Sequence, residues 1–235
     1  IATRIFDEPL DEASIGQRLS LLKEAKRQHV QIKSLAEQKV KAKLSAMAAD
    51  PERGPLFAMK YMSPLTLSEQ CLMVEWVGQG KVEKNDIKNL FPELYAYLLP
   101  SSIKTGKGNG WTNEYFQEYC LSKVGNQETG SLAKKLKELN GSQVSFETWR
   151  DGFKTVKTLM HNRQDIDIYY WIDGLGVDWI PFMTQVIDKH KADGVFLNEI
   201  YVAASELPTV TSVNKTKLDE LANGKLEKIG DVDKF

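Results

Sequence analysis

The sequence predicts an α + α/β protein, in which an N-terminal helical region precedes the first βαβ portion of a parallel sheet. Two observations support this prediction. Apolar residues recur at helical spacing, between proline and glycine breaks, as far as about residue 162. From Asp167 to Ile172 the chain is nearly all apolar and aromatic, which is typical of a strand buried on both faces of a sheet. We therefore expect a helical region over 1–163 and an incomplete α/β domain over 164–235.

The helical region divides into a long charged helix and a bundle. Residues 11–49 are rich in Ala, Leu, Lys, Gln and Glu and predict a long helix, either continuous or broken, which Asp50-Pro51 stops. Residues 65–162 predict the bundle. Its expected helices cover 68–77, 86–99, 112–123, 131–139 and 145–160.

The α/β part predicts one complete βαβ unit and the beginning of another. A strand over 167–172 is followed by a helix over 178–191 and a second strand over 195–202. The next helix is expected over 211–221. A complete sheet needs more strands than these, and the N-terminus lacks both Met and a signal-peptide pattern, so we expect the sequence to be a fragment.

Composition argues against several classes of protein. Lys and Arg number 31 against 32 for Asp and Glu, so the net charge of -1 gives no bulk electrostatic reason to expect nucleic acid or an anionic membrane. No apolar run approaches the roughly 20 residues that a membrane-spanning helix needs. Cys71 and Cys120 lack metal-ligand spacing and are expected to be buried free thiols, which favours a cytoplasmic protein.

Other residue types that often carry chemistry are better explained as structural here. His29, His161 and His190 do not pair at ligand spacing, and a histidine near a helix end is favourably placed against the helix dipole. Residues 106–110 contain three glycines but lack P-loop spacing, so a flexible loop is expected. The aromatic residues of the helical region are expected to lie in its core. They include Trp76, Tyr95, Tyr97, Trp111, Tyr115, Phe116 and Trp149.

Asp173 and Gly174 directly follow the first predicted strand. A carboxylate at the carboxyl end of a parallel strand lies where open α/β sheets bind their ligands, which predicts a metal-binding or catalytic aspartate. The alternative is an aspartate that only forms a turn or caps a helix.

A segment with several hydroxyl side chains precedes the last predicted helix. Thr209 and Thr211 fall at the expected helix N-terminus, where backbone N–H groups and the helix dipole stabilise a phosphate or an ionised alkoxide. The alternative is that one of these threonines is an ordinary N-cap residue.

Together, the strand ending at Asp173 and the segment Pro208-Thr209-Val210-Thr211-Ser212-Val213-Asn214 resemble the PglZ domain of the alkaline phosphatase superfamily, found in bacterial phage-exclusion (BREX) systems. The resemblance covers 166–235, including Gly230-Asp231-Val232-Asp233. It implies an alkaline-phosphatase-like parallel sheet, with Asp173 as a metal ligand and Thr211 as a metal-bound nucleophile. The segment is similar to the Pro-Thr-x-Thr-x-x-Asn pattern of nucleotide pyrophosphatases, which implies that Asn214 and Ser212 bind phosphate.

The resemblance implies a metal-dependent phosphatase or phosphodiesterase with zinc in a two-metal site, because a threonine hydroxyl needs a metal to remove its proton. The implied substrate is a phosphate ester such as a nucleotide or nucleic acid, and the implied partners are other phage-defence proteins. No histidine follows Thr211, so we expect only part of the metal site and an inactive fragment. The alternative function is a non-catalytic scaffold of the same defence system, with the helical region as a docking module.

Overall fold

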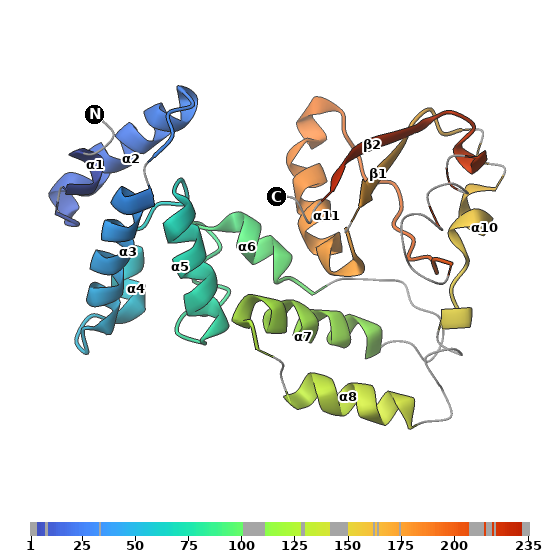
Figure 1. Ribbon diagram of the computed structural model, residues 1–235, viewed down its shortest axis with the longest axis horizontal. Helices are drawn as coiled ribbons and strands as arrows, with labels where there is room; N and C mark the ends of the chain where they lie inside the picture. Colours follow the sequence, from blue (N-terminus) through green and yellow to red (C-terminus); the bar gives the residue numbers. More distant parts are fainter. Residues whose placement is uncertain are drawn as a thin grey trace. The chain divides into compact units, whose positions relative to one another are not determined.

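The structure is a computed structural model, shown as a ribbon in Figure 1. It describes residues 4–7, 9–32, 34–100, 111–127, 130–141, 150–161, 163, 165–173, 175–206, 214, 218 and 220–231. The chain groups into two compact units. Unit 1 comprises Ile1–Leu98 and Leu121–Gln127, and unit 2 comprises Leu99–Cys120 and Glu128–Phe235. The boundary predicted at 163/164 stays a prediction. Among the described helices, none combines the length and apolar character needed to cross a membrane.

Unit 1 is helical, as the sequence predicts for this part of the chain. α3 packs against α4 and α5, and α1 packs against α2 and α3. The buried side chains between them are mainly apolar, among them Leu44, Met73 and Trp76. The helices are α1 Arg4–Asp7, α2 Glu12–Arg27, α3 Ser34–Ala49, α4 Gly54–Met59, α5 Leu67–Gly78, α6 Pro92–Tyr97 and the last residues of α7 Trp111–Gly125.

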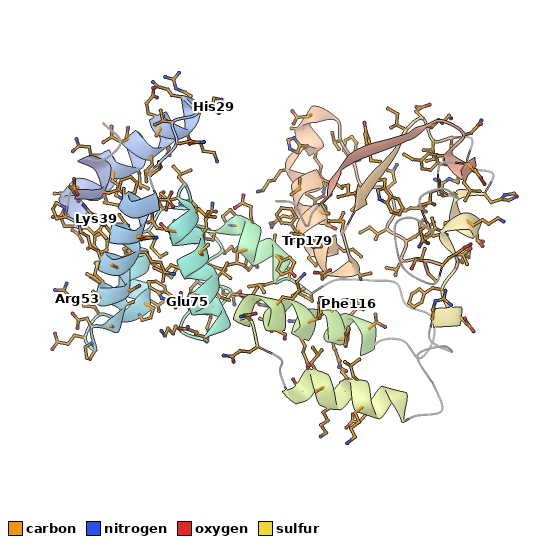
Figure 2. The ribbon with its side chains drawn as sticks, viewed as in Figure 1. His29, Lys39, Arg53, Glu75, Phe116 and Trp179 are labelled. Atoms are coloured by element: carbon orange, nitrogen blue, oxygen red, sulfur yellow. The ribbon has the colours of Figure 1, made fainter. Side chains whose placement is uncertain are left out.

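The charged helix predicted over 11–49 is broken after Arg27. His29 adopts a left-handed conformation with φ of 53° and lies at the end of α2 (Figure 2). The His29 N–H donates to the Lys26 carbonyl at 3.1 Å, and the Val30 N–H donates to the Ala25 carbonyl at 2.9 Å. These bonds form a Schellman motif, which closes a helix by satisfying its last carbonyls. The second part, α3, ends at Ala49 before Asp50-Pro51, as predicted.

The helix predicted over 86–99 is reduced to α6, which begins at Pro92. Proline fits the first turn of a helix but disfavours helical backbone at the residue before it. Phe91 accordingly has φ of -127° and ψ of 64°, outside the helical region. The prediction was wrong for residues 86–91 because it treated Pro92 as an interior residue.

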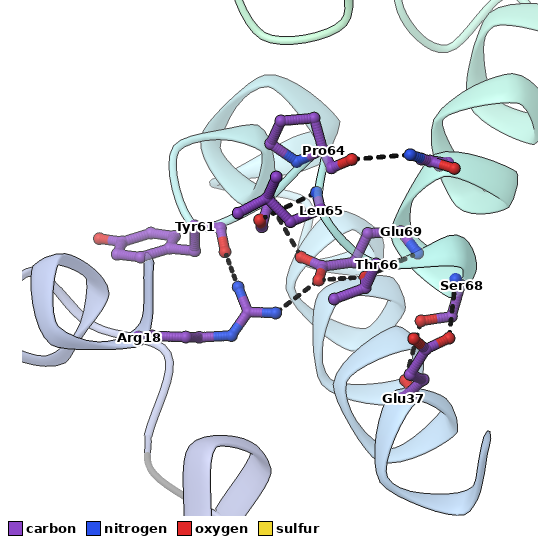
Figure 3. Close-up of polar contacts among 10 residues, drawn as sticks. Arg18, Glu37, Tyr61, Pro64, Leu65, Thr66, Ser68 and Glu69 are labelled. Carbon is purple, nitrogen blue, oxygen red and sulfur yellow. Dashed lines mark hydrogen bonds and ion pairs between the residues drawn. The ribbon is translucent and has the colours of Figure 1, made fainter. Parts of the chain in front are cut away.

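A buried ion pair joins α2 to α5 in unit 1 (Figure 3). Arg18 on α2 donates a hydrogen bond to Glu69 on α5, and their side chains are only 2% and 0% exposed. The Glu69 carboxylate also accepts from the Ser63 N–H at 2.8 Å and from the Thr66 hydroxyl at 2.6 Å. Arg18 donates to the Tyr61 carbonyl at 3.1 Å as well. Through these hydrogen bonds, the ion pair connects the turn from Tyr61 to Thr66 with both α2 and α5.

These added hydrogen bonds matter because burying two charges costs several kcal/mol per ion unless both are well compensated. Glu69 accepts three hydrogen bonds, counting that from Arg18. Removing one partner would leave a buried charge without its counterion. The network was not predicted from the sequence, in which Arg18 falls within the long charged helix expected over 11–49.

We predict that Glu69→Gln destabilises the protein by about 3–5 kcal/mol, because it leaves the Arg18 guanidinium buried without a counterion. Urea denaturation would measure the change. Glu75→Gln, on the same helix, is the matched control, since Glu75 forms a surface ion pair with Lys41 at 3.3 Å. Such pairs contribute about 1 kcal/mol or less. Equal effects of the two substitutions would contradict the assigned role of Glu69.

Two glycines allow the ends of α5 and α7 to approach closely within unit 1. A Cβ atom on Gly78 would lie 2.5 Å from the Gly125 Cα and 2.7 Å from the Val124 carbonyl oxygen. Both neighbours are backbone atoms, which cannot move away without shifting a helix. Gly16, in the middle of α2, has open space where its Cβ would lie.

We therefore predict opposite effects for two Gly→Ala substitutions. Gly16→Ala should stabilise the protein by about 0.5–1 kcal/mol, because alanine has the higher helix propensity. Gly78→Ala should destabilise it by about 1–3 kcal/mol, because the new methyl group overpacks the helix contact. Thermal unfolding of both variants would check this, and a stabilised Gly78→Ala variant would show that the two helix ends are not in contact.

Unit 2 combines helices with one parallel pair of strands. β1 Tyr169–Asp173 lies where the first strand is predicted, and β2 Leu226–Asp231 pairs with it. The predicted burial of β1 on both faces is wrong, since Tyr170 is 62% exposed. The described strands form no larger sheet. The other elements are the first part of α7, α8 Gly130–Asn140, α10 Val156–Met160, η1 Val177–Trp179, α11 Ile180–Lys189 and η2 Lys191–Asp193.

The strand predicted over 195–202 is wrong, because these residues form neither helix nor strand. Ala204 alone makes an isolated bridge to Thr155, and β1 pairs instead with β2. The predicted helix over 145–160 is also interrupted, since α10 begins after its N-cap Thr155, whose hydroxyl accepts from the Thr158 N–H. The helix predicted over 178–191 is confirmed by α11 and its flanking turns.

The free-thiol prediction is half correct. Both cysteines are free, and Cys120 is buried, but Cys71 is exposed. The buried face of α5 carries Leu72, Met73 and Trp76, so Cys71 falls on the other side of the helix. The glycine-rich loop over 106–110 lies outside the described residues.

Candidate functional site

The candidate site lies at the carboxyl ends of β1 and β2. The two strands run parallel, with Tyr169 level with Leu226 and Asp173 level with Asp231. Neighbouring strands lie about 4.8 Å apart, so the backbones of the two aspartates are adjacent. This edge is where open α/β sheets bind ligands. The structure thus brings a second acidic residue beside the one that the sequence predicts.

The alignment of the two aspartates depends on a bulge. Trp171 pairs with Lys228, whereas Ile172 pairs with Gly230, so Ile229 is an extra residue in β2. A bulge inserts one unpaired residue into a strand and changes which residues stand opposite each other beyond it. Asp231 is level with Asp173 because of this insertion.

The 3-10 turn η1 lies between β1 and α11. Gly176 precedes η1, and a Cβ atom on it would lie 2.6 Å from an Asp178 carboxylate oxygen. Asp178 is buried, and its backbone carbonyl accepts a weak hydrogen bond from the Cys120 thiol at 3.7 Å. The absence of a side chain on Gly176 therefore makes room for the carboxylate of Asp178. The sequence did not single out Asp178 as a candidate residue.

A cavity of about 320 Å³ opens next to this turn. Leu175, Gly176 and Val177 contribute to it, and Leu175 follows Asp173 by two positions, which places their backbones within about 7 Å. Most of the remaining lining comes from α11 and from residues 197–203. Tyr201, one of these residues, donates its hydroxyl to Glu199 at 2.7 Å, and this hydrogen bond raises the pKa of Tyr201. The tyrosine therefore remains neutral.

The structure describes the predicted site residues only in part. Asp173 is the last residue of β1, as predicted. Asn214 is helical, as are Leu218 and residues 220–222, in agreement with the helix predicted over 211–221. Thr209, Thr211 and Ser212 lie outside the described residues, so their predicted roles stay predictions.

Asn214 makes a two-way contact with the backbone of Glu206. Its side-chain oxygen accepts from the Glu206 N–H at 2.9 Å, and its side-chain nitrogen donates to the Glu206 carbonyl at 3.3 Å. The two hydrogen bonds join Asn214 to a residue eight positions before it in the sequence. Asn214 thus has a structural task in addition to the phosphate contact predicted for it.

The implied zinc site is not completed by the described residues. Catalytic zinc sites use three protein ligands, whereas two aspartates, Asp173 and Asp231, stand at the strand ends. Within the part of the chain that the structure describes, no group of three or more His, Cys, Asp and Glu residues is placed to hold a metal ion. His190 instead pairs with Asp193 at 2.8 Å, consistent with the structural role predicted for it.

Comparisons of the chain with protein-family models, with curated proteins and with solved structures give no match, and so assign it to no family.

We predict that Asn214→Ala lowers the free energy of unfolding by about 1–2 kcal/mol, because it removes two hydrogen bonds to the Glu206 backbone. Chemical denaturation would measure this loss. Asn198→Ala, at an exposed position of the same unit, is the control and should change stability by less than about 0.5 kcal/mol. A fully stable Asn214→Ala variant would show that the contact with Glu206 contributes nothing.

Proposed function

We propose that the carboxyl ends of β1 and β2 belong to the reaction site of a phosphoric-ester hydrolase, PglZ-like and of the alkaline phosphatase type, in a cytoplasmic phage-defence (BREX) system. The observation that supports this proposal is the register that sets Asp173 level with Asp231. The proposed fold is the first part of a larger parallel sheet, of which the described pair would be two neighbouring strands.

Because the strands are parallel, Asp173 and Asp231 fall at the same edge of the sheet, which favours a reaction site over an aspartate that only forms a turn. An aspartate that only capped α11 would need no acidic neighbour, and α11 has no side-chain cap in any case. Aspartates at paired strand positions cost stability if their carboxylates repel, unless a cation or a proton relieves the repulsion. Active sites commonly contain such pairs.

The proposed nucleophile is Thr211, with Ser212 and Asn214 as phosphate-binding residues. Asn214, Leu218 and residues 220–222 are helical, and Thr211 precedes the first of them by three positions in the sequence. Backbone N–H groups at a helix N-terminus bind anions, which suits a phosphoryl group.

A second candidate function, a scaffold that binds other defence proteins, is favoured by the exposed apolar surface of unit 2. Phe196 is 66% exposed and Tyr201 is 57% exposed, and both belong to a segment without regular structure. Large exposed apolar residues that lie near one another are typical of interaction sites.

Hydrolysis assays of the natural full-length protein would decide between the two functions. The assays would use p-nitrophenyl phosphate and bis(p-nitrophenyl) phosphate, each with Zn²⁺, Mn²⁺ or Mg²⁺. We expect Thr211→Ala to reduce hydrolysis to background, because it removes the nucleophile. Asp173→Asn and Asp231→Asn should each reduce the rate by about 100-fold or more.

Asp193→Asn is the control and should leave the rate unchanged, since Asp193 pairs with His190 at the surface, in η2 after the end of α11. Full activity of Asp173→Asn would refute the assigned site. Failure of the natural protein to hydrolyse either ester with any of the three metals would favour the scaffold.

A further inference from the structure

The cavity beside the turn after β1 has the composition of a small-molecule site. Its walls include Ile180, Met183 and Ile187 of α11, together with Leu197 and Val202. Among the described residues that line it, none has a charged side chain. Its volume of about 320 Å³ lies at the lower end of the range for ligand pockets, about 300–1,000 Å³.

Aromatic side chains hold part of this wall in place. Trp179 lines the cavity (Figure 2 labels it) and packs edge-to-face against Phe182, with ring centroids 5.7 Å apart. Tyr201 lines the cavity as well, and its hydroxyl is directed to Glu199 rather than left unpaired. A wall of two large rings favours a flat or apolar ligand, because aromatic rings stack well and lose little entropy on binding.

We infer that this cavity binds a neutral apolar or aromatic group of a small molecule. A charged ligand would lose its hydration there without gaining a counterion, since no lining residue that the structure describes is charged. The cavity begins two residues after Asp173, so a molecule seated in it can extend to the strand ends. If the proposed function holds, on which this last step rests, the bound group is the organic part of the phosphate ester.

Fluorescence titration with N-phenyl-1-naphthylamine, a neutral apolar probe, tests the inference on the whole chain. We expect saturable binding of one probe per chain. Met183→Glu places a charge in the wall and should weaken binding by about tenfold or more. Gln185→Glu makes a comparable change on the same helix at a residue outside the cavity lining, and should leave binding unchanged.

Ala203→Phe provides a second test that adds no charge. The larger side chain fills part of the cavity, so binding should weaken by a similar factor while thermal unfolding shows that the variant is folded. Absence of saturable binding to the natural chain would overturn the inference, as would unchanged binding by a folded Ala203→Phe variant.

A comparison of KM for two esters tests whether the cavity binds the organic part of the substrate, and it does so separately from the test of the proposed function. For the natural protein, Ala203→Phe should raise KM for phenyl phosphate by about tenfold and leave KM for methyl phosphate unchanged, because only the phenyl group reaches the cavity. An equal change for both esters would refute the assignment. Probe binding without hydrolysis of either ester would refute the proposed function and leave the cavity as a binding site.

Discussion

The buried ion pair between Arg18 and Glu69 is the constraint on which the arrangement of unit 1 depends. An apolar contact between α2 and α5 would tolerate small rotations of either helix. A guanidinium and a carboxylate withdrawn from water tolerate very little, because each lost hydrogen bond leaves a buried charge exposed to a low dielectric. The turn from Tyr61 to Thr66 is held in the same way, since the Tyr61 carbonyl is a partner of Arg18, and the Ser63 N–H and the Thr66 hydroxyl are partners of Glu69. We regard this network as a source of conformational specificity more than of net stability.

The helices of unit 1 could be predicted from local sequence, but their ends and their polar contacts could not. Spacing of apolar residues identifies a helix wherever one face is buried, as with α5. The end of α2 could not be predicted, because the left-handed residue that ends the helix is His29 and not the glycine usually found at this position. The Thr66-x-x-Glu69 pattern did offer a signal, since it resembles a capping box. Nothing in this local pattern indicates that the partner of Glu69 is an arginine 51 positions away.

The candidate site was predictable on one strand only. β1 is strongly apolar and its aspartate follows directly, so Asp173 could be singled out. β2 contains Glu227, Lys228 and Gly230 and does not have the composition of a buried strand, whereas residues 195–202 do have it and form none. Strand pairing depends on contacts distant in sequence, which composition does not encode. Asp231 could therefore be noted as part of the segment Gly230-Asp231-Val232-Asp233, but its position opposite Asp173 could not be predicted.

The extra residue in β2 has a consequence for how this chain can vary. If Ile229 were paired instead of bulged, the ladder would run on unshifted, and Gly230 would stand opposite Asp173. The number of residues in β2 is therefore constrained by the alignment of Asp231 with Asp173 as well as by strand pairing. Loops elsewhere in the molecule can gain or lose residues and keep the fold intact. If Ile229 were paired in the ladder, the two strands would stay hydrogen-bonded but the two aspartates would no longer stand level, whereas deletion of Ile229 would keep them level without a bulge. Related chains should therefore show either this bulge or a β2 that is one residue shorter.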